Sequence, residues 1–269
     1  RCRGTAVRQD PAVEREQLRA TFDDAAELYD RARPGYPEPL YDELSALAGL
    51  SAGDRVLEIG PGTGKATVPL AERGLDVTAV ELGEALAAVA QRNLAPYPNA
   101  RVVHADFESW RPERGGFEAV VAFTAFHWLD PDTKYERCAR LLRAGGALAV
   151  VVTHHVHPEG GDPFFADVQD AYERAGEGRA PPLRPDDAGD LRDEFVASGR
   201  FEAPAVRRYL YEVEYTADAY IDVLNTYSGH IAMPPSTREQ LYEDIRRLIG
   251  ERTIRKSYLA VLHVARRLP

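Results

Sequence analysis

The stretch Val56-Leu57-Glu58-Ile59-Gly60-Pro61-Gly62-Thr63-Gly64-Lys65 decides the fold of this 269-residue chain. Its first residues form a short apolar strand, and a helical pattern follows the glycines up to about residue 73. Glycines at a strand-to-helix junction let a ligand approach the backbone, and the free amide groups of the helix start add hydrogen-bond donors. The segment therefore predicts a ligand-binding loop at one edge of a sheet.

The spacing of these glycines distinguishes the loop from two common nucleotide-binding loops. A P-loop requires a glycine where this chain has Ile59 and a Ser or Thr where it has Ala66. A dinucleotide-binding loop counted from Gly60 requires its third glycine at the position of Lys65. Both patterns are incomplete, so neither a nucleoside triphosphate nor a nicotinamide cofactor is favoured.

Short apolar segments alternate with helical patterns along the middle of the chain. The expected strands are Arg55–Ile59, Val77–Glu81, Arg101–Ala105, Phe117–Phe123 and Leu148–Thr153, and the expected helices between them span about 63–73, 84–94 and 132–142. The run Val120-Val121-Ala122-Phe123 is apolar throughout, which indicates burial on both faces, as in parallel sheets. Alternating strands and helices of this kind predict a doubly wound α/β sheet with right-handed crossovers.

The residues on either side of this region are expected to cover the sheet. Residues 11–30 show helical spacing, which Arg33-Pro34-Gly35-Tyr36-Pro37 ends, and a second helix follows. Near the C-terminus, Tyr209–Tyr215 and Tyr258–Ala265 alternate like strands, with about 40 residues of helical pattern between them. Within that insertion Ser236-Thr237-Arg238-Glu239 resembles a capping box. The insertion is expected to lie over the sheet as a lid.

The composition narrows the classes of partner. The chain has 43 Asp and Glu against 33 Lys and Arg, a formal charge of −10, whereas nucleic-acid backbones are bound by basic surfaces. Cys2 and Cys138 provide neither a disulfide framework nor a zinc spacing. No apolar run approaches the roughly 18–20 residues of a membrane span, and the N-terminal residues lack the pattern of a secretory signal. We therefore expect a cytoplasmic protein with no nucleic-acid and no membrane partner.

The spacing Glu58-x-Gly60-x-Gly62-x-Gly64 resembles the glycine motif of class I methyltransferases that use S-adenosylmethionine. The similarity extends over about residues 54–153, because acidic residues also follow the next two strands, Glu81 after the second and Asp106 after the third. The segment Ala125-Phe126-His127-Trp128 after the fourth strand is also similar to that family. Acids in register with the glycine loop make the resemblance more specific than the loop alone.

The resemblance implies a Rossmann-like sheet of seven strands, mostly parallel, with the last strand antiparallel. It also implies three parts of the chain with different roles. Residues 1–53 form an N-terminal helical cover and residues 54–153 form the S-adenosylmethionine-binding core. Residues 154–269 complete the sheet and carry the substrate-side helical insertion at about residues 216–250.

In the family, an acid at the position of Glu81 accepts hydrogen bonds from both ribose hydroxyls of the cofactor. Leu82 would pack on the adenine, and Asp106 would accept from the adenine amino group. Thr63 has two compatible roles, capping the following helix and seating the methionine part of the cofactor. The expected cofactor contacts are Glu58, Gly60, Pro61, Gly62, Thr63, Gly64, Glu81, Leu82, Asp106, Phe107, Thr124, Tyr29 and Arg33.

The residues that touch the substrate are harder to infer. His127 and His154 follow the fourth and fifth strands, where a neutral imidazole can accept a proton during methyl transfer. A solvated loop and an aromatic wall are the alternative roles for these positions, and no metal site is expected. The expected substrate contacts are Tyr36, Phe126, Trp128, His155, Tyr227 and His230, with core packing as the alternative for Tyr227.

The function implied is methyl transfer from S-adenosylmethionine to a small-molecule acceptor, with oxygen favoured over nitrogen or carbon. Two alternatives stay open. One is a protein that binds the cofactor without transferring its methyl group, as a scaffold or as the catalyst of a rearrangement. The other is an RNA or protein methyltransferase, against which the net charge argues in the case of RNA.

Overall fold

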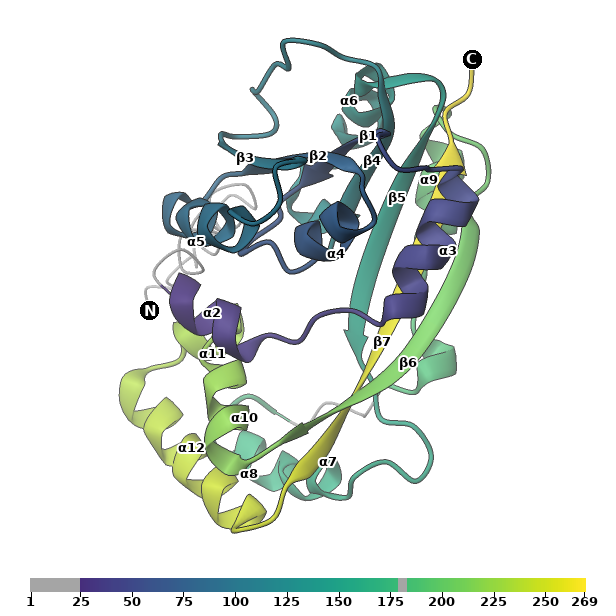
Figure 1. The fold of residues 1–269 in the computed structure, drawn as a ribbon. Coiled ribbons are helices and arrows are strands. Elements are labelled where there is room, and N and C mark those ends of the chain that lie inside the picture. Colours follow the sequence, from purple (N-terminus) through teal and green to yellow (C-terminus); the bar gives the residue numbers. More distant parts are fainter. Residues whose placement is uncertain (1–24, 179–182) are drawn as a thin grey trace, which may run out of the picture.

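The computed structural model describes residues 25–178 and 183–269, and its centre is a seven-stranded sheet in the order β3-β2-β1-β4-β5-β7-β6 (Figure 1). The strands are β1 Arg55–Ile59, β2 Asp76–Glu81, β3 Ala100–His104, β4 Phe117–Phe123, β5 Leu142–His155, β6 Ala205–Tyr215 and β7 Ile254–Arg266. The strands from β3 to β5 pair in parallel, whereas β7 is antiparallel to both β5 and β6. The predicted sheet, with its antiparallel last strand, is confirmed.

Helices cover both faces of the sheet (Figure 1). They are α2 Ala26–Ala32, α3 Glu38–Ala48, α4 Thr67–Glu72, α5 Glu84–Leu94, α6 Lys134–Leu141, α7 Phe164–Asp167, α8 Gln169–Arg174, α9 Arg192–Ala197, α10 Ala217–Leu224, α11 Ser228–Ala232 and α12 Pro235–Ile249. Two short 3-10 helices span Phe126–Trp128 and Pro185–Asp187. One apolar core contains side chains of α3 and α4, and another contains side chains of α6 and α9.

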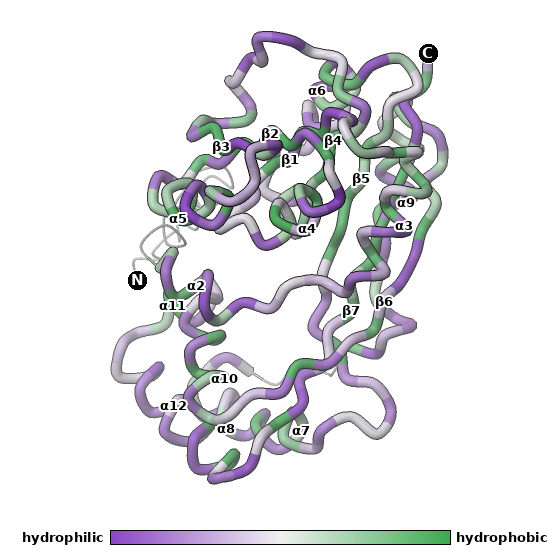
Figure 2. The backbone as a smooth tube through the Cα atoms, viewed as in Figure 1, coloured by the Kyte–Doolittle hydropathy of each residue, from purple (hydrophilic) through white to green (hydrophobic). Residues whose placement is uncertain are grey.

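The central strands bury both faces because their residues alternate between these two cores. In β4, Val120 belongs to the core beside α6, and Val121 belongs to the core beside α3. In β5, Leu148 and Ala149 divide in the same way. Figure 2 shows the resulting hydrophobic stretches at β4 and β5, whereas the residues of α12 are largely hydrophilic. This arrangement explains why both strands are continuously apolar in sequence.

Two predicted helix starts are wrong, and both errors have a physical cause. The helix expected from residue 63 begins at Thr67, because Gly60, Gly62 and Gly64 adopt positive φ angles that prolong the turn. Thr63 is therefore not its cap. Helix α12 begins at Pro235, so the segment Ser236–Glu239 lies in its first turns and forms no capping box. Most of the helix expected at residues 11–30 lies outside the described residues.

Strands β6 and β7 continue past the rest of the sheet and carry the lid, defined here as residues 216–250 with helices α10, α11 and α12 (Figure 1). The lid has an apolar core of its own, to which α7 and α8 contribute. Phe164 of α7 packs edge-on against Tyr220 of α10, with ring centroids 5.6 Å apart. A helical insertion is therefore present between the last two strands, as expected.

Helix α2 bridges the sheet half and the lid half of the molecule (Figure 1). Toward α5, Arg92 donates to both carboxylate oxygens of Glu27, at 2.7 and 2.9 Å. Toward the lid, Arg33 donates from Nε to the Thr226 hydroxyl and from Nη2 to the Thr226 carbonyl, both at 2.7 Å. The segment after α2 is thus attached to the lid near the middle of the molecule.

No helix in the described ranges is long and apolar enough to cross a membrane.

The close packing of Gly60 predicts a measurable loss of stability on substitution. Its φ is +62°, and an added Cβ would lie 2.8 Å from the Cβ of Ala125. We expect Gly60→Ala to lower the free energy of unfolding by about 2–4 kcal/mol, from backbone strain and overpacking together. Gly35 has open space around it and no positive φ, so Gly35→Ala is the matched control, within about 0.5 kcal/mol of the parent. Equal urea-unfolding midpoints for the two variants would contradict this packing.

Candidate functional site

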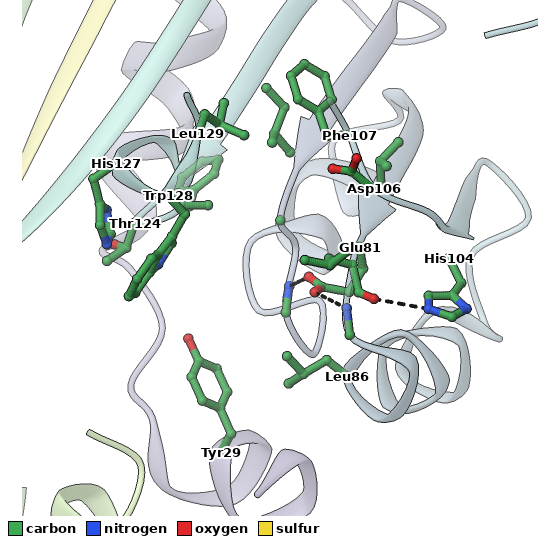
Figure 3. Close-up of a pocket in the computed structure, with 18 of the residues that line it drawn as sticks. Tyr29, Glu81, Leu86, His104, Asp106, Phe107, Thr124, His127, Trp128 and Leu129 are labelled. Atoms are coloured by element: carbon green, nitrogen blue, oxygen red, sulfur yellow. Dashed lines mark hydrogen bonds between the residues drawn. The ribbon is translucent and has the colours of Figure 1, made fainter. Parts of the chain in front are cut away.

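A cavity of about 750 Å³ lies between the carboxyl ends of the parallel strands and α2 with the adjoining lid, and Figure 3 shows Tyr29 of α2 facing the strand-end residues across it. This volume is within the range of roughly 300–1,000 Å³ typical of small-molecule sites. We call it the outer cavity. Loops after β1, β2, β3 and β4 line it, together with α2 and the lid residues Tyr227 and Ser228. Doubly wound sheets bind ligands at this edge, so its position alone marks it as the candidate site.

Glu81, at the end of β2, organises the base of the outer cavity. Its Oε2 accepts from the amide of Gly62 at 2.8 Å, and its Oε1 accepts from the amide of Gly83 at 2.9 Å (Figure 3). The side chain is 6% exposed and lines the cavity. A carboxylate has about four acceptor positions, so these two amides leave acceptor capacity for ligand hydroxyl groups.

An apolar side chain and a second acid flank Glu81. Leu82 is 41% exposed and lines the outer cavity, although large apolar side chains are more often buried. Its carbonyl accepts a hydrogen bond from His104 Nε2 at 3.0 Å. Asp106 lines the cavity beyond β3, and its Oδ1 accepts from the amide of Glu108 at 3.0 Å. The site therefore offers an exposed apolar side chain and two carboxylates.

The glycine loop forms the adjoining wall. A Cβ on Gly62 would meet Cε1 of Tyr29 at 3.6 Å, so the loop and α2 approach each other closely. Of the predicted cofactor residues, the outer cavity is lined by Gly60, Gly62, Glu81, Leu82, Asp106, Phe107, Thr124, Tyr29 and Arg33. Gly64 packs against Ala90 of α5, and Thr63 is 1% exposed; neither lines this cavity.

A smaller space of about 80 Å³, the inner cavity, joins the outer one toward β5 and β7. The two share five lining residues, which are Tyr29, Arg33, Gly60, Phe123 and Thr124. The remaining lining residues include three tyrosines, Tyr36, Tyr211 and Tyr258. A ligand in the outer cavity and a second one in the inner cavity would therefore meet at this shared boundary.

Glu58 is the acid of the inner cavity, where Pro61 also contributes to the wall. Its side chain is fully buried. Burial raises the pKa of Glu58 to about 7, and the charge of Glu81 acts in the same direction. The carboxyl group is therefore divided between its charged and neutral forms near neutral pH.

Arg33 stands at the boundary between the two cavities. Its guanidinium lies between the rings of Tyr29 and Tyr227, at 5.2 and 4.1 Å from their centroids. The hydrogen bonds to Thr226 use two of its five N–H donors. Among residues 25–178 and 183–269 it forms no ion pair with a carboxylate, so its charge faces the cavities without a protein counter-ion.

The histidines that follow β4 and β5 lie in different places. His127 lines the outer cavity beside Trp128, with ring centroids 4.7 Å apart (Figure 3). His155 lines the inner cavity, and its ring contacts Tyr227 and Tyr258 at 5.0 and 5.3 Å. The surrounding protein and the charge of Lys256 hold the pKa of His155 well below its usual range. His155 is thus a neutral imidazole at neutral pH.

His154, the second histidine expected as a catalytic base, lines neither cavity. Successive strand residues point to opposite faces, so His154 lies across the sheet from His155. Burial there, with the charge of Arg208 next, lowers the pKa of His154. The sequence places two histidines side by side and cannot show which one faces the site.

Two predicted substrate contacts also lie in apolar cores instead of the cavities. Phe126 is 2% exposed and packs edge-on against Tyr135, because the short helix after β4 turns it inward. His230 is buried inside the lid, stacked on Tyr242, and its Nε2 is 3.2 Å from the Tyr172 hydroxyl. The predicted contacts Tyr36, Trp128, His155 and Tyr227 do line a cavity.

Several cavity residues were not predicted. Tyr211 and Tyr258 both line the inner cavity because the antiparallel register of β6 and β7 pairs them. The sequence shows the alternating pattern of both strands, but it does not show the register in which the two strands pair. Lys65 lines the inner cavity too. In the part of the chain that the structure describes, no three His, Cys, Asp or Glu side chains are grouped to hold a metal ion.

Several known proteins with similar sequences or folds are methyltransferases by name. A methyltransferase domain family matches residues 56–146. An uncharacterised methyltransferase of Geobacillus kaustophilus is 30% identical over 186 residues, covering 66% of this chain and 80% of that protein. One of Mycobacterium tuberculosis is 29% identical over 240 residues, 88% of each chain. The solved structure of a putative type II methyltransferase from Anaeromyxobacter dehalogenans has a TM-score of 0.63 at 23% identity, covering 88% of this chain and 99% of that one.

The buried His230 predicts an acid-dependent part of the stability. Burial, with the charges of Lys256 and Arg238, lowers the pKa of His230 to about 4, from about 6.5 in an unfolded chain. The unfolded state therefore binds the proton first, and the contribution is fully present above pH 6.5 and lost as pH falls toward 4. We expect a loss of about 1.4 kcal/mol per pH unit in that window.

Urea unfolding between pH 4.5 and 7.5 measures this dependence, with the pH values chosen to span the window between the two pKa values. His230→Gln should flatten the curve, while a residual slope persists because burial also lowers the pKa of His155 and His263. His104→Gln, at an exposed position, is the control substitution. An unaltered slope in His230→Gln would rule out this assignment.

Proposed function

The chain belongs to the class I S-adenosylmethionine-dependent methyltransferases, and we propose that it transfers a methyl group from this cofactor to a small-molecule acceptor. One observation carries the proposal: the two cavities share a boundary at Arg33 and Thr124. The outer cavity has the volume and the acids for a nucleoside-containing cofactor. The inner cavity provides a separate, aromatic-walled space for the group that is methylated.

The residues of the outer cavity fit the cofactor chemically. The remaining acceptor positions of Glu81 suit the two ribose hydroxyls, and the exposed Leu82 suits one face of the adenine. Asp106 retains acceptor capacity for the adenine amino group. Gly62 lines this cavity with its backbone alone, and Tyr29 and Arg33 would cover the methionine part. We assign cofactor binding to residues 54–153 together with this N-terminal cover.

The proposed chemistry asks little of the protein beyond placement. When bound, the cofactor supplies a methyl group on a positively charged sulfur, and its displacement leaves a neutral thioether. The chain has to hold the acceptor in line, exclude water and receive a proton where the acceptor must lose one. Tyr227 and the aromatic walls of the inner cavity perform the first two tasks in this proposal.

His127 is the proposed proton acceptor, because it lines the outer cavity and belongs to the segment after β4. His155 would contact the acceptor as a neutral group. The preference for an oxygen acceptor rests on the frequency of O-methylation among small-molecule methyltransferases. The lid, residues 216–250, is assigned to acceptor binding, and the charge of −10 favours a small acceptor over RNA.

Release of S-adenosylhomocysteine tests the activity directly. The purified protein is incubated with S-adenosylmethionine and a panel of phenols, aliphatic alcohols, carboxylic acids and amines, with RNA and a protein mixture as further arms. We expect turnover on a small oxygen-containing acceptor and none on RNA. Tight cofactor binding without turnover in any arm would favour the protein that binds the cofactor without methyl transfer.

Glu81 provides the sharpest test of the cofactor site. Glu81→Gln replaces one acceptor oxygen with a donor, so either the Gly62 or the Gly83 amide loses its partner and the ribose contact weakens. We expect S-adenosylhomocysteine to bind at least about tenfold more weakly, consistent with about 1.5–3 kcal/mol for a charged hydrogen bond. Calorimetric titration measures the affinity, and Glu239→Gln on the exposed face of α12 is the control. An affinity equal to that of the parent would remove Glu81 from the site.

A further inference from the structure

Lys256 of β7 is a buried lysine with no counter-ion in the part of the chain that the structure describes. Its side chain is 7% exposed, and its ammonium lies over three aromatic rings, 4.8 Å from Phe165, 5.5 Å from Tyr220 and 5.6 Å from Tyr258. Among residues 25–178 and 183–269, no carboxylate lies within 4.0 Å of the ammonium. The charged group that acts on it is Arg33, which has the same sign.

The other two lysines of the chain show that this environment is unusual within the protein. The 33 basic residues include three lysines. Lys134 is also buried, but its ammonium is 3.0 Å from a carboxylate oxygen of Glu194. Lys65 is subject to the charge of Asp30. Lys256 thus differs from both in having no acid to oppose its charge.

A buried charge is expensive unless it is paired, and the aromatic rings compensate for only part of the lost hydration. Burial, with the charge of Arg33 next, lowers the pKa of Lys256 to about 7, from an ordinary value of about 10.5. An anion beside the ammonium would reverse this shift. An anionic ligand should therefore gain more binding free energy from Lys256 than from an exposed lysine.

The lysine is adjacent to the proposed acceptor space. Its ammonium lies over the ring of Tyr258, and this ring also lines the inner cavity beside His155. Arg33 lines the same cavity. The one acid among the residues lining that cavity, Glu58, precedes the glycine loop, whereas Lys256 lies on the lid-bearing strand β7. Lys256 is therefore not part of the cavity wall itself, but it contacts the wall residue Tyr258, close to the positive charge of Arg33.

We propose that the acceptor is a small aromatic acid whose carboxylate is bound by Lys256, with Arg33 contributing a second positive charge. The inference rests on the proposed methyl transfer and specifies the class of acceptor for the same site. The aromatic walls formed by Tyr36, Tyr211 and Tyr258 suit a planar body. With its carboxylate held at the lid end of the inner cavity, the acceptor would direct its opposite side to the boundary with the outer cavity.

Three lysines make direct observation possible. Protein labelled with ¹³C at the lysine ε-carbon gives three resonances, assigned with Lys→Arg variants. The samples contain saturating S-adenosylhomocysteine, and the probes are matched pairs: benzoate and benzamide, 4-hydroxybenzoate and 4-hydroxybenzamide, and phenylacetate and phenylacetamide. We expect at least one acid to raise the pKa of Lys256 by a unit or more, which corresponds to about tenfold coupling. Its amide should not, and the Lys134 resonance serves as the internal control.

Two substitutions separate charge recognition from packing. Lys256→Met keeps the length and removes the charge, and we expect it to weaken binding of the acid at least tenfold. It should leave the affinity for S-adenosylhomocysteine unchanged and should not lower the melting temperature, because an unpaired buried charge is removed. Lys256→Arg should retain part of the preference for acid over amide. Phenyl phosphate, a further probe, distinguishes a carboxylate site from a phosphate site.

The pH dependence identifies the group responsible. Affinity for the acid should be constant below about pH 7 and fall about tenfold per unit above it, because the protonated lysine binds the acid. Burial lowers the pKa of His155 and His230 and raises that of Tyr220 and Tyr258, so these groups do not titrate in this window. Glu58 of the inner cavity has a pKa of about 7 and loses its proton in the same range. Lys256→Met separates the two contributions, because the part of the pH dependence that is due to the lysine disappears in this variant and the part due to Glu58 remains.

Failure of this inference is distinct from failure of the proposed function. If no acid in the panel shifts Lys256, if amides bind as tightly as acids, or if Lys256→Met binds acids like the parent, the acid-binding role is wrong. Methyl transfer to a neutral acceptor would then still stand. If acids bind through Lys256 but no acceptor is methylated, the proposed function fails and the anion site remains.

Discussion

The carboxylate of Glu81 is the contact on which the rest of the site depends. It accepts from the amides of Gly62 and Gly83, so it joins the glycine loop after β1 to the turn that starts α5. Both amides belong to backbone that no strand or helix pairs at that point, and a buried amide without a partner costs about 1–3 kcal/mol. One acid therefore fixes the shape of the outer cavity and leaves acceptor positions facing into it. Because the same carboxylate both holds the loop amides and faces the cavity, an acid at the strand end and a glycine loop occur together.

The second determinant is the way β6 and β7 extend beyond the sheet. They carry the lid away from the strands, and α2 connects the two halves through the Arg33–Thr226 hydrogen bonds (Figure 1). The boundary between the cavities is thus assembled from the N-terminal segment, the sheet edge and the lid. A ligand pair that spans both cavities would contact all three regions, so binding and the relative position of the lid are physically linked.

The sequence alone was sufficient to predict the features that depend on local residue patterns. The strands of the sheet, and the acids Glu81 and Asp106 at its edge, follow from apolar runs and from the rule that parallel strands end together. The start of α4 was missed because positive φ angles at the glycines prolong the loop. The roles of His154 and His155 depended on which face of β5 each residue occupies, and adjacent histidines give no indication of that. Lys256 required the tertiary arrangement, since its environment comes from rings on β7, α7 and α10.

The central claim is that the outer cavity holds the cofactor with its reactive end at the boundary of the inner cavity. A crystal structure of the protein with S-adenosylhomocysteine tests it most directly. The account predicts the ribose hydroxyls on Glu81, the adenine between Leu82 and Asp106, and the sulfur beside Arg33 and Thr124, facing the inner cavity. A cofactor bound elsewhere, or one whose sulfur points away from the inner cavity, would contradict the account.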